Sequence, residues 1–291
     1  MPIRCPACGL PADSHPAGQF STDSLAGWQL LTCPTCTHSF CQQAFGLPVD
    51  YDEVHSTQYL DQSAGELAEA DRHQRFILLP PYLAFHRNLG RPAGRLLLDV
   101  GCGAGRFLLG ARGLGWKVIG SEPSARAVAT ARSCGLEIQD GNPADLPEAS
   151  VDVLCLFDVI EHLAIPGEFL AALLHLVRPG GYLFLSVPNW DCELMRKAER
   201  ADWLPPVHLQ FFTAGSLATL LSGVGAGWQQ PVVSIVSSDP QPPLSLSWTA
   251  DGGMSFRSRF FLHERLRWQL RRLRRLPSHP AQLAAIMQRR A

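Results

Sequence analysis

Residues 96–107 have the sequence LLLDVGCGAGRF, and this short stretch decides the fold. An aliphatic run leads to Asp99, and glycines follow at positions 101, 103 and 105. The run predicts a buried strand, and the residues after the turn predict a helix closed by glycine. Because glycine has no Cβ, such a turn lets the backbone approach a ligand closely. The turn therefore indicates a small-molecule site; the alternative is a tight connection that binds nothing.

Aliphatic runs and helical patterns alternate along the next ninety residues. The expected strands lie at 117–122, 136–141, 151–160 and 182–189, and the expected helices at 124–135 and 166–181. Strands separated by helices favour an α/β fold, a Rossmann-like doubly wound and mostly parallel sheet. Ligands of such sheets bind beyond the carboxyl ends of the strands, where the glycine turn would lie.

Composition limits the class of protein. The chain has 291 residues, 46% of them hydrophobic, which is enough to bury a substantial core. It has no run of 18 apolar residues and no apolar segment at its N-terminus, so we expect neither a spanning helix nor a secretory signal. Nine cysteines without an export signal favour metal sites or free thiols over disulfides. A cytoplasmic location is expected.

Two Cys-x-x-Cys pairs stand near the N-terminus, Cys5 with Cys8 and Cys33 with Cys36. Four thiolates at this spacing suit tetrahedral Zn(II), and the interval between the pairs can form a ribbon hairpin. A redox pair and incidental cysteines are the alternatives. With four protein ligands the zinc would be structural, in a small N-terminal zinc ribbon.

The chain divides into four segments: a zinc ribbon (1–45), a linker with one helix (46–95), a ligand-binding domain (96–236) and a C-terminal segment (237–291). The last segment begins rich in Pro and Ser. Its final part, 251–291, holds ten Arg and two acidic residues, a net charge of +8, whereas the rest of the chain, with 15 basic and 24 acidic residues, has −9.

Residues 256–276 predict a basic amphipathic helix, since leucines recur there at three- or four-residue spacing. Such a helix can lie on an anionic membrane surface, which would make the protein membrane-peripheral. It can bind RNA phosphates, or it can dock on the acidic domain with its arginines in water. The sequence leaves all three open.

Six motifs in order resemble class I S-adenosylmethionine-dependent methyltransferases, and most closely the group that includes the quinone O-methyltransferases. The resemblance covers residues 95–236, and its motifs are LLLDVGCGAG, VIGSEPS, DGNPADLP, VDVLCLFDVIEHL, LVRPGGYLFLSVPN and HLQFFT. It implies S-adenosylmethionine as the cofactor. Members of the family usually end with an antiparallel strand, for which only residues 244–248 (LSLSW) or the tail are candidates here.

The resemblance also implies roles for individual residues. The glycine turn and its acid would hold the methionine end of the cofactor, Glu122 the ribose, and Asn142 the adenine amino group. Pro143 has no N–H to offer to adenine, so that contact is lost or shifted to Ala144. The implied cofactor-binding residues are Asp99, Gly101, Cys102, Gly103, Gly105, Glu122, Pro123, Asn142, Phe157, Asp158 and, from the preceding helix, Arg75.

Two histidines are candidates for a general base. Methyl transfer to a hydroxyl or an acidic carbon benefits from a base that titrates near neutrality. His162 follows the 151–160 strand, and His208 opens HLQFFT. Capping and packing are the alternative for His162. The preferred function is O- or C-methylation of a sugar-, envelope- or quinone-like small molecule; RNA methylation and a non-catalytic cofactor-binding module are the alternatives.

Overall fold

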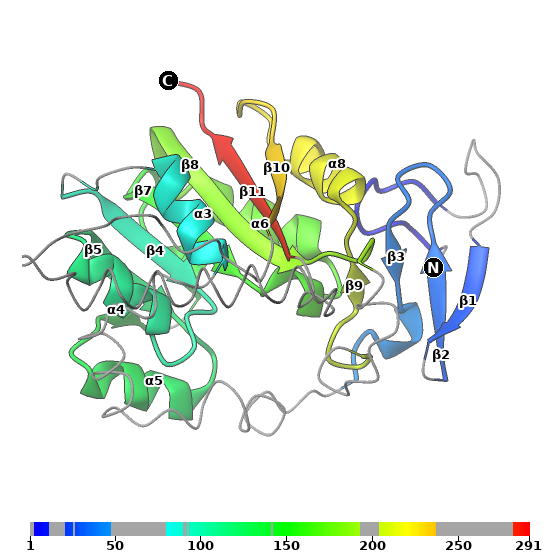
Figure 1. The fold of residues 1–291 in the computed structure, drawn as a ribbon, viewed down its shortest axis with the longest axis horizontal. Helices are drawn as coiled ribbons and strands as arrows, with labels where there is room; N and C mark the ends of the chain where they lie inside the picture. Colours follow the sequence, from blue (N-terminus) through cyan, green and yellow to red (C-terminus); the bar gives the residue numbers. More distant parts are fainter. Residues whose placement is uncertain are drawn as a thin grey trace, which may run out of the picture.

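The computed structural model describes residues 3–11, 21–25, 27–47, 80–89, 92, 94–140, 142–192, 204–236 and 282–291. These residues form a large sheet with helices on both faces and a smaller sheet beside it (Figure 1). No helix in these ranges is long and apolar enough to cross a bilayer. Arg75, residues 244–248 and residues 256–276 lie outside the described ranges, so the predictions made for them are not addressed.

The large sheet has the strand order β10-β11-β8-β7-β4-β5-β6. Strands β6, β5, β4, β7 and β8 are mutually parallel, and β11 runs antiparallel to both of its neighbours. This is the doubly wound, mostly parallel sheet expected from the sequence. The strands are β4 (Leu96–Val100), β5 (Lys117–Ser121), β6 (Ile138–Gln139), β7 (Val151–Phe157), β8 (Val177–Pro188), β10 (Val232–Val236) and β11 (Gln282–Gln288).

Helices connect these strands much as predicted. The side chain of Ser124 accepts a hydrogen bond from the Ala127 N–H and so caps α5, as expected of an N-cap serine. Pro80 and Pro81 begin α3, because the first turn of a helix needs no N–H donors. The helices are α3 (Pro80–Leu89), α4 (Arg106–Gly113), α5 (Ala125–Ser133), α6 (Pro166–Leu174) and α8 (Ala214–Val224), with short 3₁₀ turns η1 (Gln42–Ala44), η4 (Pro143–Asp145) and η5 (Ile160–His162).

The predicted helix at 166–181 is shorter than expected. Helix α6 ends at Leu174, and β8 begins at Val177, so the Pro179-Gly180 pair lies inside the strand. Gly181 is needed there, because a Cβ at this position would lie 2.7 Å from the carbonyl oxygen of Asp152. Gly181 therefore allows β8 to lie close to β7, and the Pro179-Gly180 pair does not mark the end of α6.

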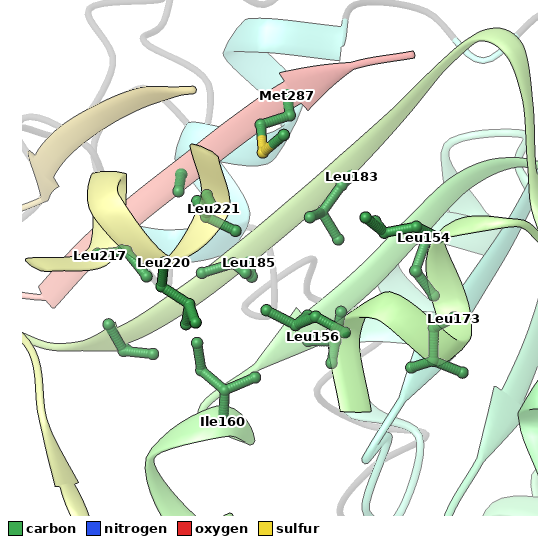
Figure 2. Close-up of a cluster of buried hydrophobic side chains, with 14 of the residues drawn as sticks. Leu154, Leu156, Ile160, Leu173, Leu183, Leu185, Leu217, Leu220, Leu221 and Met287 are labelled. Carbon is green, nitrogen blue, oxygen red and sulfur yellow. The ribbon is translucent and has the colours of Figure 1, made fainter. Parts of the chain in front are cut away.

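Apolar side chains fill both faces of the sheet. On one face, helices α6 and α8 pack leucines against β7, β8 and β11, with Ile160 and Met287 at the periphery (Figure 2). On the other face, α3 and α4 cover an aromatic cluster in which Phe85 contacts Phe107 and Phe184 edge-on. The two layers hold the carboxyl ends of the strands in fixed positions.

The end of the chain supplies a strand of the large sheet. β11 pairs with β8 from Gln282 opposite Pro188 to Gln288 opposite Tyr182, and with β10 on its other side. The tail thus provides the antiparallel strand whose origin the sequence left open. Residues 282–288 belong to this sheet and not to a separate C-terminal segment, because Leu283 and Met287 are buried in its core.

The small sheet has the order β1-β2-β3-β9, from β1 (Ser21–Leu25), β2 (Trp28–Thr32), β3 (Ser39–Phe40) and β9 (Gln210–Phe211). The hairpin of β1 and β2 lies where the sequence predicts the ribbon hairpin. Strand β9 comes from the HLQFFT motif and pairs antiparallel with β3 (Figure 1). The N-terminal segment and the segment 96–236 therefore share one sheet.

Candidate active site and cysteine cluster

The candidate site lies where the order of the strands reverses. Strand β4 has β5 on one side and β7 on the other, so the connections leave it in opposite directions. The glycine turn follows β4, and Asp158 follows β7. The sequence predictions on these two segments are thus brought together at the position where doubly wound sheets bind ligands.

The glycine turn has the conformation that its sequence predicts. Gly101, Gly103 and Gly105 have φ of 76°, 53° and 83°, a left-handed region that other residues seldom adopt. The N–H groups of Gly101 and Cys102 both donate to the carbonyl oxygen of Ser121, at 2.8 and 3.1 Å. The turn is thereby fixed to the end of β5. The Cys102 side chain is buried, which raises the pKa of its thiol, so this residue can offer a ligand only its backbone.

Glu122 braces the turn. One carboxylate oxygen accepts from the Gly103 N–H and the other from the Ser124 N–H, each at 2.9 Å. Pro123, between these contacts, is exposed. A carboxylate oxygen can accept more than one hydrogen bond, so a carboxylate at this position suits two hydroxyl groups of a ligand.

Asp99 is buried directly behind the turn. Its Oδ1 has no hydrogen-bond partner among the described residues. Burial, and to a smaller degree the charge of Glu122, raise the pKa of the Asp99 carboxyl well above its ordinary value. A buried acceptor without a donor is costly, and a ligand that donates hydrogen bonds or carries positive charge would relieve it.

These features fit S-adenosylmethionine. A Cβ at Gly103 would meet no atom of the described residues within 4 Å, so within this part of the chain the backbone there is open to a ligand. The buried Asp99 carboxyl, which lacks a donor for Oδ1 among the described residues, suits the positively charged ammonium and sulfonium groups of the cofactor. Glu122, held by two backbone N–H groups, suits its ribose hydroxyls. The residues predicted for the methionine and ribose ends are therefore suitably placed.

The adenine end differs from the expectation. The Asn142 side-chain oxygen accepts from the Ala144 N–H at 3.1 Å and caps η4. The Ala144 N–H is therefore engaged, and a shift of the adenine contact to this group is not supported. Asn142 is exposed, and its oxygen retains one lone pair for a ligand.

Asp158 is held by two partners that sequence reasoning missed. Its carboxylate accepts from the Ser186 hydroxyl at 3.1 Å and from the Gln282 amide at 2.9 and 3.0 Å. Burial raises its pKa to about 6, although both hydrogen bonds oppose the shift. Phe157, next to it, packs on Phe107 and Tyr82. Gln282 is 124 positions away in the chain, and no local pattern links the two residues.

The two candidate bases lie together. The rings of His162 and His208 meet edge-on, with centroids 4.7 Å apart. Nδ1 of His162 lies 2.9 Å from the carbonyl oxygen of Val207. Leu209 donates its N–H to the carbonyl oxygen of Glu161 at 2.8 Å, so backbone contacts join the two histidine segments.

Glu161 is the residue that the sequence analysis did not single out. Its side chain is fully buried beside the two histidines, and neither carboxylate oxygen has a hydrogen-bond partner within the described ranges. Burial, and secondarily the charge of Asp158, raise the pKa of this carboxyl well above its ordinary value. The only sequence signal is its position before His162.

The four predicted zinc ligands converge. The Sγ atoms of Cys5 and Cys36 are 3.5 Å apart, those of Cys8 and Cys33 are 3.7 Å apart, and all four lie within 4.8 Å of one another. Four sulfurs around a tetrahedral Zn(II) lie about 3.8 Å apart. The donor set therefore fits structural zinc. Two other potential zinc ligands close to these cysteines in the sequence have different partners. His38 forms a hydrogen bond with Gln210, and the Cys41 thiol donates to the backbone carbonyl of Gln29.

Comparison with known proteins agrees with this geometry. A sequence model of a family described as a methyltransferase domain matches residues 72–227, more than half of the chain. The chain belongs to this family. A probable S-adenosylmethionine-dependent methyltransferase of Mycolicibacterium smegmatis is 35% identical over 147 residues, which cover 49% of this chain and 56% of that protein. A ubiquinone biosynthesis O-methyltransferase of Caulobacter vibrioides is 31% identical over 156 residues, covering 47% of this chain and 62% of that protein.

Solved structures show the same fold at low sequence identity. A chain from the complex of the Haloferax volcanii Trm112 methyltransferase activator with a putative methyltransferase has a TM-score of 0.53 and 16% identity, covering 84% of this chain and all of that one. An S-adenosylmethionine-dependent methyltransferase from Mesorhizobium loti has a TM-score of 0.51 and 17% identity, covering 79% of this chain and all of that one. The methyltransferase fold is thereby established for this chain. The matched part of the chain spans about three fifths of the length of the two curated relatives described above.

Proposed function

We propose that the protein is an S-adenosylmethionine-dependent methyltransferase that acts on a small-molecule acceptor. The observation that carries the proposal is the glycine turn with its two acids, Asp99 and Glu122, at the switch point of a methyltransferase sheet. The curated relatives support a small acceptor, since one is named for ubiquinone biosynthesis. A sugar-, envelope- or quinone-like metabolite with an acceptor oxygen or carbon fits this class.

The residues around the turn would hold the cofactor. Gly103 would leave room for its methionine end, and Asp99 would accept from its ammonium group. Glu122 would accept from the ribose hydroxyls while it continues to brace the turn. Asp158 would border the transferring methyl group, and Asn142 would lie toward the adenine. When bound, S-adenosylmethionine supplies an electrophilic methyl group on its sulfonium.

The chain must then align the acceptor and handle its proton. His208 is nearly buried, and His162 lies against it, so an acceptor at this position is largely shielded from water. If the acceptor is a hydroxyl, the His208–His162 pair is placed to favour loss of its proton as the methyl group arrives. The proposed catalytic residues are therefore His208 and His162.

A labelling experiment tests the proposal. Purified protein and methyl-labelled S-adenosylmethionine are offered a small-molecule and lipid extract and, separately, total RNA from undermodified cells. We expect label in the extract, and at least a ~100-fold lower rate for His208→Ala, the size of effect typical of general acid–base catalysis. His175→Ala, on the far end of α6, is the control. Label in RNA alone would replace the small-molecule acceptor with a nucleic acid.

The remaining proposals concern the rest of the chain. Residues 1–45 are proposed as a structural zinc ribbon and residues 96–236, together with β11, as the catalytic domain. None of the nine cysteines forms a disulfide in the structure, in keeping with a reducing, cytoplasmic location. Contact of residues 256–276 with a membrane or with a nucleic acid stays a prediction from the sequence.

A further inference from the structure

The large sheet ends on one side in strand β10, which pairs only with β11 (Figure 1). No strand in the described part of the chain pairs with the outer edge of β10. The outer edge of a terminal strand presents N–H and C=O groups that can form the hydrogen bonds of a sheet with a further strand. This edge is therefore a position where another chain can add to the sheet.

Apolar side chains are exposed on both faces of this edge. Ile235 is 67% exposed and Val232 is 60% exposed, the two highest values among the large apolar side chains that the structure describes. They are three positions apart in one strand, so they lie on opposite faces of the sheet. The strand has the sequence VVSIV, with no charged residue and no proline. It thus lacks the features that usually protect an edge from association.

The other sheet edges have this protection. Strand β6, at the opposite end of the large sheet, has two residues and is followed by Asp140, which forms an ion pair with Arg132. Arg132 also donates to the backbone carbonyl of Ile138, at 3.0 Å. In the small sheet, β9 has two residues, and β1 carries the exposed, charged Asp23. Exposure of a longer, uncharged and apolar edge is therefore particular to β10 among these four strands.

The sequence of β10 is complementary to a second copy of itself. Two antiparallel copies related by a two-fold axis at Ser234 place Val232 opposite Val236 of the partner subunit. The same axis places Val233 opposite Ile235 of the partner subunit, so every apolar side chain meets another. Like charges directly opposite each other destabilise a strand pair, and β10 brings no charge to the axis. A second copy of this chain therefore fits this edge in both charge and apolar pattern.

We propose that β10 is the interface of a homodimer, in which the β10 strands of two copies pair antiparallel and join the two large sheets. The assembly stops at two copies, because a two-fold pairing occupies both β10 edges and the β6 edges are protected. The strand contributes five residues per copy, whereas a standard interface has about 20–30 residues a side. The dimer is therefore weak and dissociates on dilution.

Sedimentation velocity of the full-length protein tests the interface. We expect the wild type to shift from monomer to dimer as its concentration rises. Ile235→Lys should raise the dimer dissociation constant at least ~10-fold, because it removes an apolar contact and places a charge at the paired edge. Leu114→Lys, at an exposed apolar residue that ends α4, is the matched control and should dimerise like the wild type. A wild type that stays monomeric up to its solubility limit overturns the proposal, as does undiminished dimerisation of Ile235→Lys.

A cross-link tests the register of the two strands. Directly opposed residues of antiparallel strands have Cα atoms about 4.5–5.5 Å apart, which a disulfide can span. Ser234→Cys should therefore form a covalent dimer with oxidised glutathione as the oxidant. Ser133→Cys, exposed at the end of α5 near the β6 edge, is the control and should not. If Ser234→Cys forms no more covalent dimer than Ser133→Cys, the pairing is refuted even if the protein dimerises. Neither experiment depends on methyl transfer, so a failure of the proposed function leaves both results unchanged.

Discussion

At the level of single residues, the glycine turn contains positions with two different requirements. Gly105 has no room for a side chain, because its Cβ would lie 2.1 Å from Cδ1 of Leu136. Gly103 has that room, and its Cβ would enter the open space beside the turn. Packing against Leu136 thus requires glycine at position 105, whereas the ligand that the turn is proposed to hold requires glycine at position 103.

Alanine at these two positions should therefore separate folding from binding. We expect Gly103→Ala to fold, at a cost of about 1–2 kcal/mol for its left-handed backbone, and to bind S-adenosylhomocysteine at least ~10-fold more weakly. Gly105→Ala should be destabilised beyond that cost, since Leu136 must move. Thermal unfolding and calorimetric titration measure the two effects. Wild-type affinity in Gly103→Ala would show that the ligand does not approach this backbone.

Sequence reasoning identified some site residues and missed others for a physical reason. Asp99 is the second-last residue of β4 and Glu122 directly follows β5, so a local motif places both at the carboxyl edge of the sheet. Glu161 becomes notable only because tertiary packing removes it from water and leaves it without donors. Gln282 reaches Asp158 through a strand pairing that no local pattern contains.

At the level of elements, β9 connects the cysteine-rich segment to the candidate site. The Gln210 amide donates to the carbonyl oxygens of Leu163 and Ala164, at 2.8 and 3.3 Å. Its oxygen must then accept from Nε2 of His38, which lies 2.8 Å away on the cysteine-rich side. Burial lowers the pKa of His38 to about 4, so this ring is neutral near pH 7. One glutamine thus holds the loop after His162 against the ribbon.

Replacing this glutamine should affect both stability and the reaction. Gln210→Leu leaves the buried donor of His38 and the Leu163 carbonyl without partners, and each such group costs about 1–3 kcal/mol. We expect a lower melting temperature and a reduced kcat, because the loop that carries Glu161 and His162 loses its tether. Gln229→Leu, which breaks an exposed pair with Gln288, is the control. An unchanged kcat in Gln210→Leu would refute the coupling of the ribbon to the site.

Elements defined by local periodicity were predicted well, and those defined by long-range pairing were not. Helices α4 and α5 and strands β4, β5 and β7 follow hydrophobic patterns that a short window contains. Strand β9 has two residues, and its partner β3 lies about 170 positions earlier. The early start of β8 depends on a glycine that packs under Asp152, a contact visible only in three dimensions.

For the whole molecule, the fold depends on the last ten residues. Strand β11 lies between β8 and β10, so removing it would separate the edge of the sheet from its centre (Figure 1). Leu283 and Met287 also fill the core beneath α8. The same strand carries Gln282 to Asp158. The pairing of the sheet, the filling of the core and the support of Asp158 therefore all depend on β11.

Truncation should consequently be far more damaging than its length suggests. Ending the chain at residue 281 deletes the buried side chains of Leu283 and Met287, whose burial stabilises the fold by about 1.5–3 kcal/mol each, and removes the hydrogen bonds of β8 and β10 to β11. This loss is comparable with the 5–15 kcal/mol that stabilises a typical domain, so we expect the truncated chain to lack cooperative unfolding and cofactor binding. Circular dichroism during heating, with calorimetric titration of S-adenosylhomocysteine, measures both.

Two further variants make this last prediction decisive. Removing only the exposed Ala291 should leave the melting temperature unchanged, which controls for truncation as such. Leu283→Ala should destabilise the protein by about 2–5 kcal/mol through the cavity it creates, yet keep the strand and the Gln282 contact. We therefore expect Leu283→Ala to bind S-adenosylhomocysteine normally at low temperature. If the chain ending at 281 instead unfolded cooperatively near the wild-type temperature, the sheet would be stable without β11, and the tail would serve the site alone.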